Sequence, residues 1–306
     1  MSELRFSIVI ACYNQEGFVR EAVESALSQE HPSKEIIVVD DGSRDGTTDV
    51  LNTFGTSIIL ARLPLNCGAN TARNHGASLA SGEYLVFLDG DDVLMSWALN
   101  VYDRLITARC PKFILGRAAI FHGKVPKVKT GDLTSTIQFV EYADFLAKDR
   151  PGLYNTSTLV VNRSIFWSEG GWSEGIFYQD IQDLLTKLGV SGKMILVFAP
   201  DTVWYRMHST NAVHKVSSFL DGIHVLLAKA RAGLYPGGRE RWVGRSAWFG
   251  GLIFYWTKKA MRAGLYRSGF NLLASGWWMI LFAVIRRGTV WLVGRKPIEL
   301  LPFEHD

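Results

Sequence analysis

Cysteines, signal-like segments and repeats are few or missing in this sequence. The three cysteines, Cys12, Cys67 and Cys110, lie far apart, and none has a CxxC spacing. Neither a disulfide framework nor a cysteine-based zinc site is predicted, so a reducing cytoplasm is the expected compartment. The amino-terminal segment has early charges and only a short apolar run, which predicts a first strand and not a signal peptide. No internal repeat or low-complexity segment is found.

Acidic residues are rare towards the carboxyl-terminal end. Residues 229–306 hold 13 Lys and Arg against 4 Asp and Glu, whereas the whole chain of 306 residues has a net charge of +4. Six of the ten tryptophans also lie there. Basic residues mixed with aromatic ones are typical of segments that bind an anionic membrane surface. No nucleic-acid partner is predicted.

One stretch of this region, residues 268–285, has no charged residue. As a helix it would be about 27 Å long, the short limit for a bilayer crossing. Three arrangements are open: helices that lie in the membrane interface, a true span, or an appendage buried on the domain or in a homodimer.

Short apolar runs rich in Val and Ile predict the first strands, at residues 6–11, 35–40, 57–62 and 84–89. Their spacing of about 25 to 30 residues fits alternating strands and helices, and their continuous apolarity favours a parallel sheet covered on both faces. A helical pattern lies between the first two, over residues 18–27. Residues 111–200 are less regular, with three strand-like runs and a helix-like run at 179–188. From about residue 217 the pattern is helical.

Three carboxylates follow the apolar run at 84–89: Asp89, Asp91 and Asp92, with Gly90 after the first. In open α/β sheets, ligands bind beyond the carboxyl ends of the strands. Two carboxylates one residue apart can hold Mg²⁺ or Mn²⁺ beside a phosphate ligand that supplies the other oxygens. Taken alone, the pattern is weak evidence for a metal site, because acidic turns are common.

Four motifs in this order and spacing resemble the nucleotide-sugar-binding half of family 2 glycosyltransferases of the GT-A type. The motifs are IACYNQEGFVREAVESALSQ, IIVVDDGSRDGT, NCGANTARNHG and GEYLVFLDGDD. The resemblance covers about residues 5–105 and continues more weakly to about 211. It implies an α/β fold with a mixed, mostly parallel sheet flanked by helices, over residues 1–215. Residues 1–105 would form the nucleotide-binding half and 106–215 the acceptor half, followed by a helical, membrane-associating extension at 216–306.

The resemblance also implies a nucleotide site. Tyr13 would lie against the base, Asp41 would accept a hydrogen bond from a uracil-type N–H, and Ala11 would contact the same nucleotide. Arg73 would lie near the diphosphate or the acidic loop, and Asp89 near the ribose. Each has a structural alternative: Tyr13 as rim packing, Asp41 as a turn residue and Arg73 as a structural ion pair.

Metal binding and catalysis are implied by further matches. Asp91 would hold the Mn²⁺ or Mg²⁺, which acts on the departing diphosphate. His208, in the stretch WYRMHSTN, would complete the site, although a lone histidine can also be structural. Asp92 would either assist or cap the next helix.

The expected base is Asp180, which the resemblance places after a GGW loop. The family has a Glu-Asp pair at this point, whereas this chain has Gln179 before Asp180. Asp183, on the next helical turn, is the second choice of base, and a helix cap is the structural alternative for Asp180. No QxxRW stretch occurs, so transfer of one sugar per acceptor is favoured over processive synthesis.

The resemblance therefore implies an inverting, metal-dependent glycosyltransferase that uses a nucleoside-diphosphate sugar, with UDP favoured. A lipid-linked or other glycan precursor at the cytoplasmic membrane face is the expected acceptor. Two other functions stay open, a nucleotide-sugar-binding protein without turnover and a nucleotidyltransferase of the same fold. The second is disfavoured because no Gly-rich phosphate loop follows the first strand.

Overall fold

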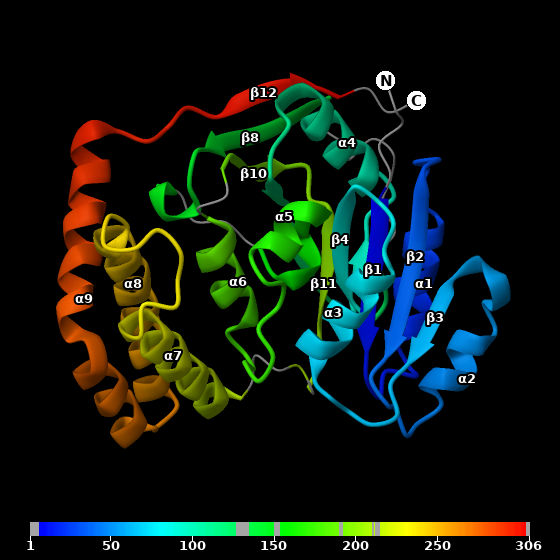
Figure 1. Cartoon of the computed structure of the whole chain (residues 1–306), viewed down its shortest axis with the longest axis horizontal. Coiled ribbons are helices and arrows are strands. Elements are labelled where there is room, and N and C mark those ends of the chain that lie inside the picture. Colours follow the sequence, from blue (N-terminus) through cyan, green and yellow to red (C-terminus); the bar gives the residue numbers. More distant parts are fainter. Residues whose placement is uncertain are drawn as a thin grey trace.

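The computed structural model describes residues 6–126, 135–149, 154–189, 192–209, 211 and 215–303. Residues 1–5 of the expected amino-terminal segment and Thr210 of the WYRMHSTN stretch lie outside this range. The described strands form a nine-stranded and a three-stranded sheet (Figure 1). In chain order they are β1 (Phe6–Cys12), β2 (Lys34–Asp40), β3 (Ile59–Arg62), β4 (Tyr84–Asp89), β5 (Val93–Leu94), β6 (Phe113–Leu115), β7 (Ala118–His122), β8 (Thr136–Tyr142), β9 (Leu159–Asn162), β10 (Met194–Ala199), β11 (Val203–Met207) and β12 (Glu299–Pro302).

The large sheet has the order β12-β8-β10-β6-β9-β4-β1-β2-β3. Strands β4, β1, β2 and β3 are parallel neighbours, as the apolar runs predict. Strand β9 is antiparallel to both β4 and β6, and β8 is antiparallel to β10 and β12. The carboxyl ends of β1, β2 and β4 therefore meet at one edge of the sheet. The small sheet, β5-β11-β7, brings the residues that follow β4 next to β11.

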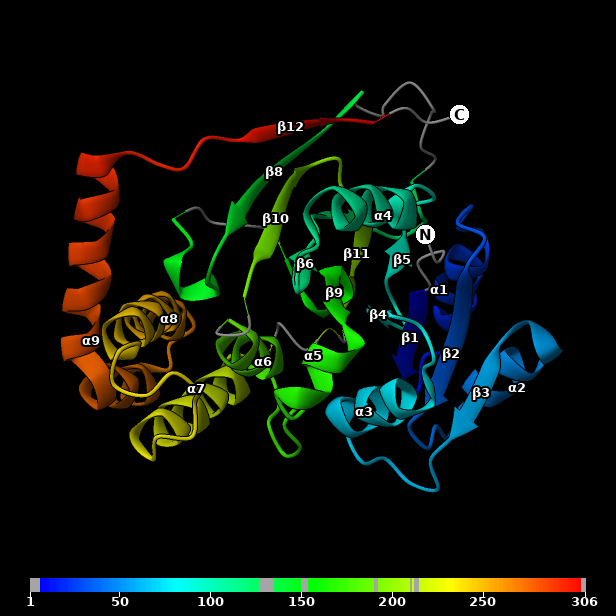
Figure 2. The same ribbon diagram turned by 45° about the horizontal axis from the view of Figure 1, so that its top comes forward.

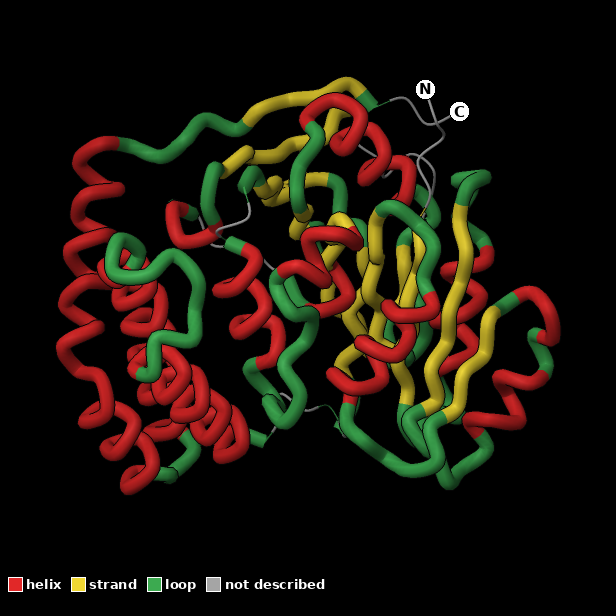
Figure 3. The backbone as a smooth tube through the Cα atoms, in the orientation of Figure 1, coloured by secondary structure: helices red, strands yellow, loops and turns green. Residues whose placement is uncertain are grey.

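Helices cover both faces of the large sheet (Figure 3). They are α1 (Val19–Leu27), α2 (Thr47–Asn52), α3 (Ala69–Leu79), α4 (Ala98–Arg109), α5 (Arg163–Ser168), α6 (Asp180–Leu188), α7 (Val216–Arg231), α8 (Trp242–Arg262) and α9 (Tyr266–Val293). Alternate residues of β1 point to opposite faces, so Ile8 and Ile10 pack with α1 and α4, whereas Val9 and Ala11 pack with α3 and α6. Both sides of β1 are thus buried, which explains its apolar run from Ile8 to Cys12.

The last three helices form a third apolar core beside the sheet (Figure 1). Helices α8 and α9 pack closely at Gly250 of α8, where a Cβ atom would lie only 2.0 Å from the carbonyl oxygen of Met279 in α9. Helix α9 is kinked at Gly276, whose φ and ψ of −164° and 29° are not helical. After α9 the chain returns to the large sheet as β12, which runs antiparallel to β8 (Figure 2). The helical pattern of the tail did not predict this strand.

Candidate active site

A cleft of about 1080 Å³ lies at the carboxyl ends of β1, β2 and β4. All eight site residues expected from the sequence line it, although they come from distant parts of the chain. They are Ala11, Tyr13, Asp41, Arg73, Asp89, Asp91, Asp180 and His208. A second cavity of about 450 Å³, bounded by residues 42–44 and 62–65, contains none of them.

Gly90 lets the acidic loop, residues 89–92, approach the end of β1. A Cβ atom at Gly90 would lie 2.2 Å from Oε1 of Gln15 and 2.7 Å from Cβ of Cys12, so no larger residue fits. The backbone N–H of Gly90 donates a 3.1 Å hydrogen bond to the carbonyl oxygen of Ala11. The glycine is thus required by this close approach to β1, besides the turn that the sequence predicts.

The three carboxylates of this loop have different neighbours. Asp89 Oδ1 accepts a 2.7 Å bond from Arg73. Asp91 Oδ2 lies 2.9 Å from Nε2 of His208. Asp92 is fully buried and accepts hydrogen bonds from the hydroxyl of Ser157, at 2.5 Å, and from the backbone N–H of Arg206, at 3.0 Å.

Asp92 therefore does not cap the following helix, which was one of its two expected roles. It ties the acidic loop to β11 and to the segment before β9. Burial, followed by the charges of Asp91 and Asp89, raises the pKa of Asp92 well above its usual range.

Arg73 joins two ends of the cleft. Its guanidinium is buried and donates to Asp89 Oδ1 at 2.7 Å and to Asp180 Oδ2 at 2.6 Å. It also lies over the ring of Trp172, with its Cζ atom 5.0 Å from the ring centroid. Arg73 thus lies against the acidic loop, which is one of the two positions expected for it. It also makes the structural ion pair that was the alternative.

Asp41 lies at the end of β2, where its carboxylate closes the following loop. Oδ1 accepts from the N–H of Cys67 at 2.8 Å, and Oδ2 from the N–H of Gly68 at 2.9 Å. Burial raises the pKa of Asp41, and these two bonds act against the rise. Each oxygen keeps a lone pair, so the turn role and the expected contact with a base are compatible. Tyr13, 39% exposed, offers an accessible ring in the same cleft.

Asp180 is the first residue of α6, and its side chain turns towards Arg73 in the cleft. Its side chain is 19% exposed, and Oδ1 is not bonded to Arg73. Gln179 is buried, and its Nε2 has no hydrogen-bond partner among the residues that the structure describes. The substitution of the family's acidic neighbour thus leaves an unpaired amide at the cleft.

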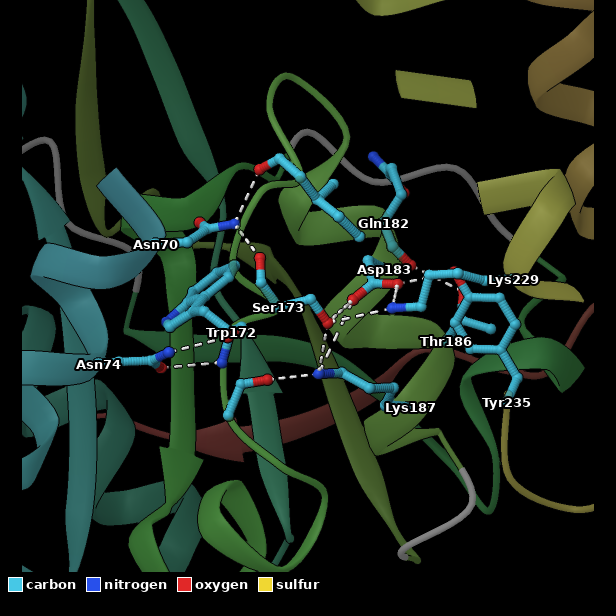
Figure 4. A network of polar contacts seen from close by, with 12 residues as sticks. Asn70, Asn74, Trp172, Ser173, Gln182, Asp183, Thr186, Lys187, Lys229 and Tyr235 are labelled. Atoms are coloured by element: carbon cyan, nitrogen blue, oxygen red, sulfur yellow. Dashed lines mark hydrogen bonds and ion pairs between the residues drawn. The ribbon is translucent and has the colours of Figure 1, made fainter. Parts of the chain in front are cut away.

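Asp183, the second choice of base, is wrong for that role because it is buried and already engaged. Its carboxylate contacts Lys229, accepts from the hydroxyls of Ser173 at 2.6 Å and Tyr235 at 2.7 Å, and lies 3.7 Å from Nζ of Lys187. Figure 4 shows this group, in which α6 is tied to α7. Nearby, Asn70 and Asn74 of α3 hold the loop at residues 171–176 through its carbonyl oxygens.

Sequence reasoning missed Arg206, which binds the acidic loop from β11. Its Nε donates to the carbonyl oxygen of Asp91 at 2.9 Å, and its guanidinium also contacts Glu21. The group lies between the rings of Phe18 and Phe121, at 5.1 and 4.5 Å from their centroids. The available signal was its place in the WYRMHSTN stretch, two residues before His208.

Asp91 and His208 could hold a divalent cation together. Among the described residues no group of three or more His, Cys, Asp or Glu side chains is arranged as metal ligands. Two protein ligands are enough for Mg²⁺ or Mn²⁺ when a diphosphate and water supply the rest. The donor set therefore fits a metal shared with a nucleotide, and does not fit an all-protein metal cage.

The class of protein is defined by an α/β sheet whose parallel strands end at an acidic cleft. The sequence model described as "Glycosyl transferase family 2" matches residues 7–167, more than half of the chain. The chain belongs to this family, as the resemblance of its motifs implied.

Two relatives show how far the similarity extends. The "Putative teichuronic acid biosynthesis glycosyltransferase TuaG" of Bacillus subtilis is 31% identical over 146 residues, which are 47% of this chain and 55% of that protein. The "UDP-Glc:alpha-D-GlcNAc-diphosphoundecaprenol beta-1,3-glucosyltransferase WfaP" of Escherichia coli is 45% identical over 87 residues, 28% of this chain and 35% of that one. The chain thus spans about half or less of the length of these relatives.

Solved structures confirm the predicted fold class. S. aureus TarS 1–349 in complex with UDP-GlcNAc gives a TM-score of 0.56 at 14% identity, covering 95% of this chain and 93% of that one. The mannosyltransferase PcManGT from Pyrobaculum calidifontis, in complex with GDP-Man and Mn²⁺, gives 0.57 at 16% identity, covering 94% and 87%. At such identities the likeness shows the fold alone.

Proposed function

We propose that this chain is an inverting, metal-dependent glycosyltransferase that moves one sugar from a nucleoside-diphosphate sugar to a hydroxyl of a glycan or lipid-linked acceptor. The observation that carries this proposal is the single cleft, in which Asp180 meets the strand ends that resemble a nucleotide-sugar site. Structures of the same fold that contain UDP-GlcNAc or GDP-Man support the class of donor. Asp41 beside Tyr13 favours UDP.

Asp180 is the proposed base. Its carboxylate removes the proton of the acceptor hydroxyl while that oxygen attacks the anomeric carbon, and the bond to the diphosphate oxygen breaks in the same displacement. One displacement inverts the configuration at that carbon. Arg73 orients Asp180 through the 2.6 Å contact with Oδ2, which leaves Oδ1 to receive the proton.

The charge of the cleft supports a cation. Among the described residues, four carboxylates line the cleft, and its Lys and Arg residues are Arg73 and Lys215. Arg73 is already paired with two of the carboxylates. A diphosphate would add further negative charge. A cation held by Asp91 and His208 would act as a Lewis acid on the departing diphosphate.

The test is a screen of nucleotide sugars with Mn²⁺ or Mg²⁺, in which release of nucleoside diphosphate and transfer to an acceptor are measured separately. We expect Asp180→Asn to lower kcat of transfer by about 100-fold or more, because general-base catalysis is lost, while donor binding persists. Unchanged transfer by this variant would refute the base. If the wild type binds donors but releases no nucleoside diphosphate, the protein is a binding module without turnover.

Asp91→Ala tests the metal. Donor binding that Mn²⁺ stimulates in the wild type should lose this stimulation in the variant, and retained stimulation would place the metal elsewhere. Ser43→Ala, in the same half of the chain but outside the cleft lining, is the control.

A cytoplasmic, peripheral position on the membrane is part of the proposal. Helix α9 is long and apolar enough to cross a bilayer, with 28 residues and an 18-residue window of mean hydropathy 1.6. Its exposed side chains include Phe270, Trp277, Ile285, Trp291 and Leu292. The basic charge of residues 229–306 adds attraction to anionic lipids.

A span is disfavoured because α9 is attached to the same body at its middle and towards its carboxyl-terminal end. Arg231 of α7 contacts the carbonyl oxygen of Ser275, and Arg286 donates to that of Lys148 at 2.6 Å. Strand β12 then pairs with β8 in the catalytic sheet. We therefore propose that α9 lies in the interface of the cytoplasmic leaflet.

Flotation with vesicles tests this position. The full chain should float with phosphatidylglycerol vesicles, float less in high salt and remain unbound to phosphatidylcholine. Trp291→Glu should reduce the bound fraction without affecting donor release. Protein that resists carbonate or high-salt extraction like an integral protein would favour a span instead.

We further propose that residues 1–215 form the glycosyltransferase unit, with its nucleotide half at 1–105, and that 216–306 are a C-terminal region. Strand β12 belongs to the catalytic sheet, so this region ends within the first unit. Truncation at residue 215 should therefore destabilise the catalytic unit by exposing β8.

A further inference from the structure

The cleft continues past Asp180 onto the C-terminal helices. Its lining includes Phe219 of α7, Tyr255 and Trp256 of α8, and Lys215 just before α7. These residues lie outside the part of the chain that matches the family, residues 7–167. We propose that α7 and α8 form the acceptor subsite of the cleft and that it takes a saccharide ring of the acceptor. This rests on the proposed function and names the chemistry of its second substrate.

The aromatic residues form a platform next to the proposed base. The rings of Phe219 and Trp256 stack, with centroids 4.3 Å apart and an interplanar angle of 13°, and Nζ of Lys259 lies 4.6 Å from the Trp256 centroid. Trp256, 7% exposed, therefore supports Phe219 from behind, and Tyr255, 58% exposed, offers the accessible ring of the platform. Tyr178 lies 5.3 Å from Phe219 and is two residues from Asp180 in the chain. Tyr178 has a φ of 66°, a backbone conformation that non-glycine residues rarely adopt and that often occurs at functional sites.

Unpaired amides lie beside this platform. Gln179 Nε2 and Gln182 Oε1 are buried and have no hydrogen-bond partner among the described residues, and both side chains line the cleft. A buried amide atom without a partner is costly, so a ligand that donates and accepts hydrogen bonds would favour a turn of these side chains towards the cleft. Saccharide hydroxyls do both, and the C–H face of a pyranose ring packs against an aromatic face.

The subsite is fixed relative to the base. Lys229 and Tyr235 follow Phe219 in the chain, and both contact Asp183, which is one helical turn after Asp180 in α6 (Figure 4). This buried group ties α7 to the helix that carries the base. A ring held on the platform would therefore present a hydroxyl to Asp180 in a constant position.

The platform and the exposed apolar side of α9 are separate surfaces. Every residue of α9 is described, and none lines the cleft. A lipid-linked acceptor could thus contact the membrane-facing side with its lipid while its sugar lies on the platform, but the subsite itself needs only the sugar.

The test measures transfer from the donor found in the nucleotide-sugar screen to a panel of p-nitrophenyl glycosides, with donor hydrolysis in the absence of acceptor as a second readout. We expect Tyr255→Ala and Phe219→Ala to raise the KM for the glycoside about 10-fold, with donor hydrolysis unchanged. Tyr266→Ala is the matched control, since Tyr266 is 67% exposed, like Tyr255 at 58%, and lies outside the cleft. Because Tyr255 is exposed, its variant should fold even if Phe219→Ala does not.

The outcomes separate the two proposals. A wild type that neither hydrolyses nor transfers from any nucleotide sugar would overturn the proposed function. A wild type that transfers, with Tyr255→Ala and Phe219→Ala at the wild-type KM, would overturn the subsite alone. Transfer only to a polyprenyl phosphate that carries no sugar would also overturn it, in favour of a lipid subsite.

Discussion

Among single substitutions in the cleft, a change at Arg73 should lower the free energy of unfolding the most. Arg73 is 5% exposed, and its guanidinium lies 2.6 Å from the carboxylate of Asp180 and 2.7 Å from that of Asp89. The side chains of these two aspartates are 19% and 29% exposed. In Arg73→Met the two carboxylates face each other without a counter-charge. Removing one partner of a buried ion pair costs about 3–5 kcal/mol.

The lower end applies here because water reaches both carboxylates in part. A loss of about 3 kcal/mol corresponds to a fall of roughly 5 °C in Tm for a chain of 306 residues. Arg62→Met is the matched control: Arg62 is 55% exposed and lies 3.6 Å from Asp40, so the same change should cost about 0–1 kcal/mol.

Thermal and urea unfolding of the two variants give the comparison. A double variant, Arg73→Met with Asp89→Asn, should lose less than the sum of the single changes, because one of the uncompensated charges is removed. If Arg73→Met is no less stable than Arg62→Met, the two contacts do not stabilise the ligand-free protein, and our account of Arg73 as the link between β4 and α6 is wrong.

Two further predictions concern other parts of the fold. Burial, with the charge of Arg286, lowers the pKa of Lys148 to about 8. The charged lysine therefore destabilises the folded protein below pH 8, and this destabilisation is relieved as the pH rises from 8 to about 10.4, the pKa of a lysine in the unfolded chain. The Tm of the wild type should therefore rise relative to that of Lys148→Met between pH 8 and pH 10.5, and a constant difference would contradict the shift. In α8, Gly251→Ala should stabilise by up to about 1 kcal/mol, because nothing lies within 4 Å of the new Cβ. Gly250→Ala should instead destabilise by about 1–3 kcal/mol through overlap with Met279, and equal effects of the two changes on urea unfolding would show that α9 moves away freely.

The first strands could be predicted because burial on both faces determines their sequence. Strands β1, β2 and β4 are buried on both faces over most of their length, so each contains a run of consecutive apolar residues and ends where polar residues begin. Strand β12 could not be predicted in this way. It lies at the edge of the sheet with alternating exposure, and it is a strand only because β8 offers free backbone groups.

The site was predictable to the extent that its residues lie in continuous motifs. All eight expected residues line one cleft. Five of them, Ala11, Tyr13, Asp41, Asp89 and Asp91, lie at the carboxyl ends of β1, β2 and β4, which are neighbours in one sheet. Arg206 and Ser157 were missed because their role is to bind the acidic loop from 114 and 65 residues away in the chain. Asp183 was misjudged for a related reason: its partners Lys229 and Tyr235 come from the C-terminal region, so its burial cannot be read from α6 alone.

These distant contacts also distinguish carboxylates that look alike in the sequence. Arg73 pairs with both Asp89 and Asp180, and Ser157 with the N–H of Arg206 satisfies the hydrogen bonds of Asp92. Among the described residues, the side chain that contacts the carboxylate of Asp91 is a histidine, which brings a positive charge only when protonated. A neutral imidazole beside a carboxylate attracts a metal ion, whereas an arginine in the same place would repel it. The chain thus compensates its other acidic groups itself and leaves Asp91 as the one best suited to share a divalent cation with a diphosphate.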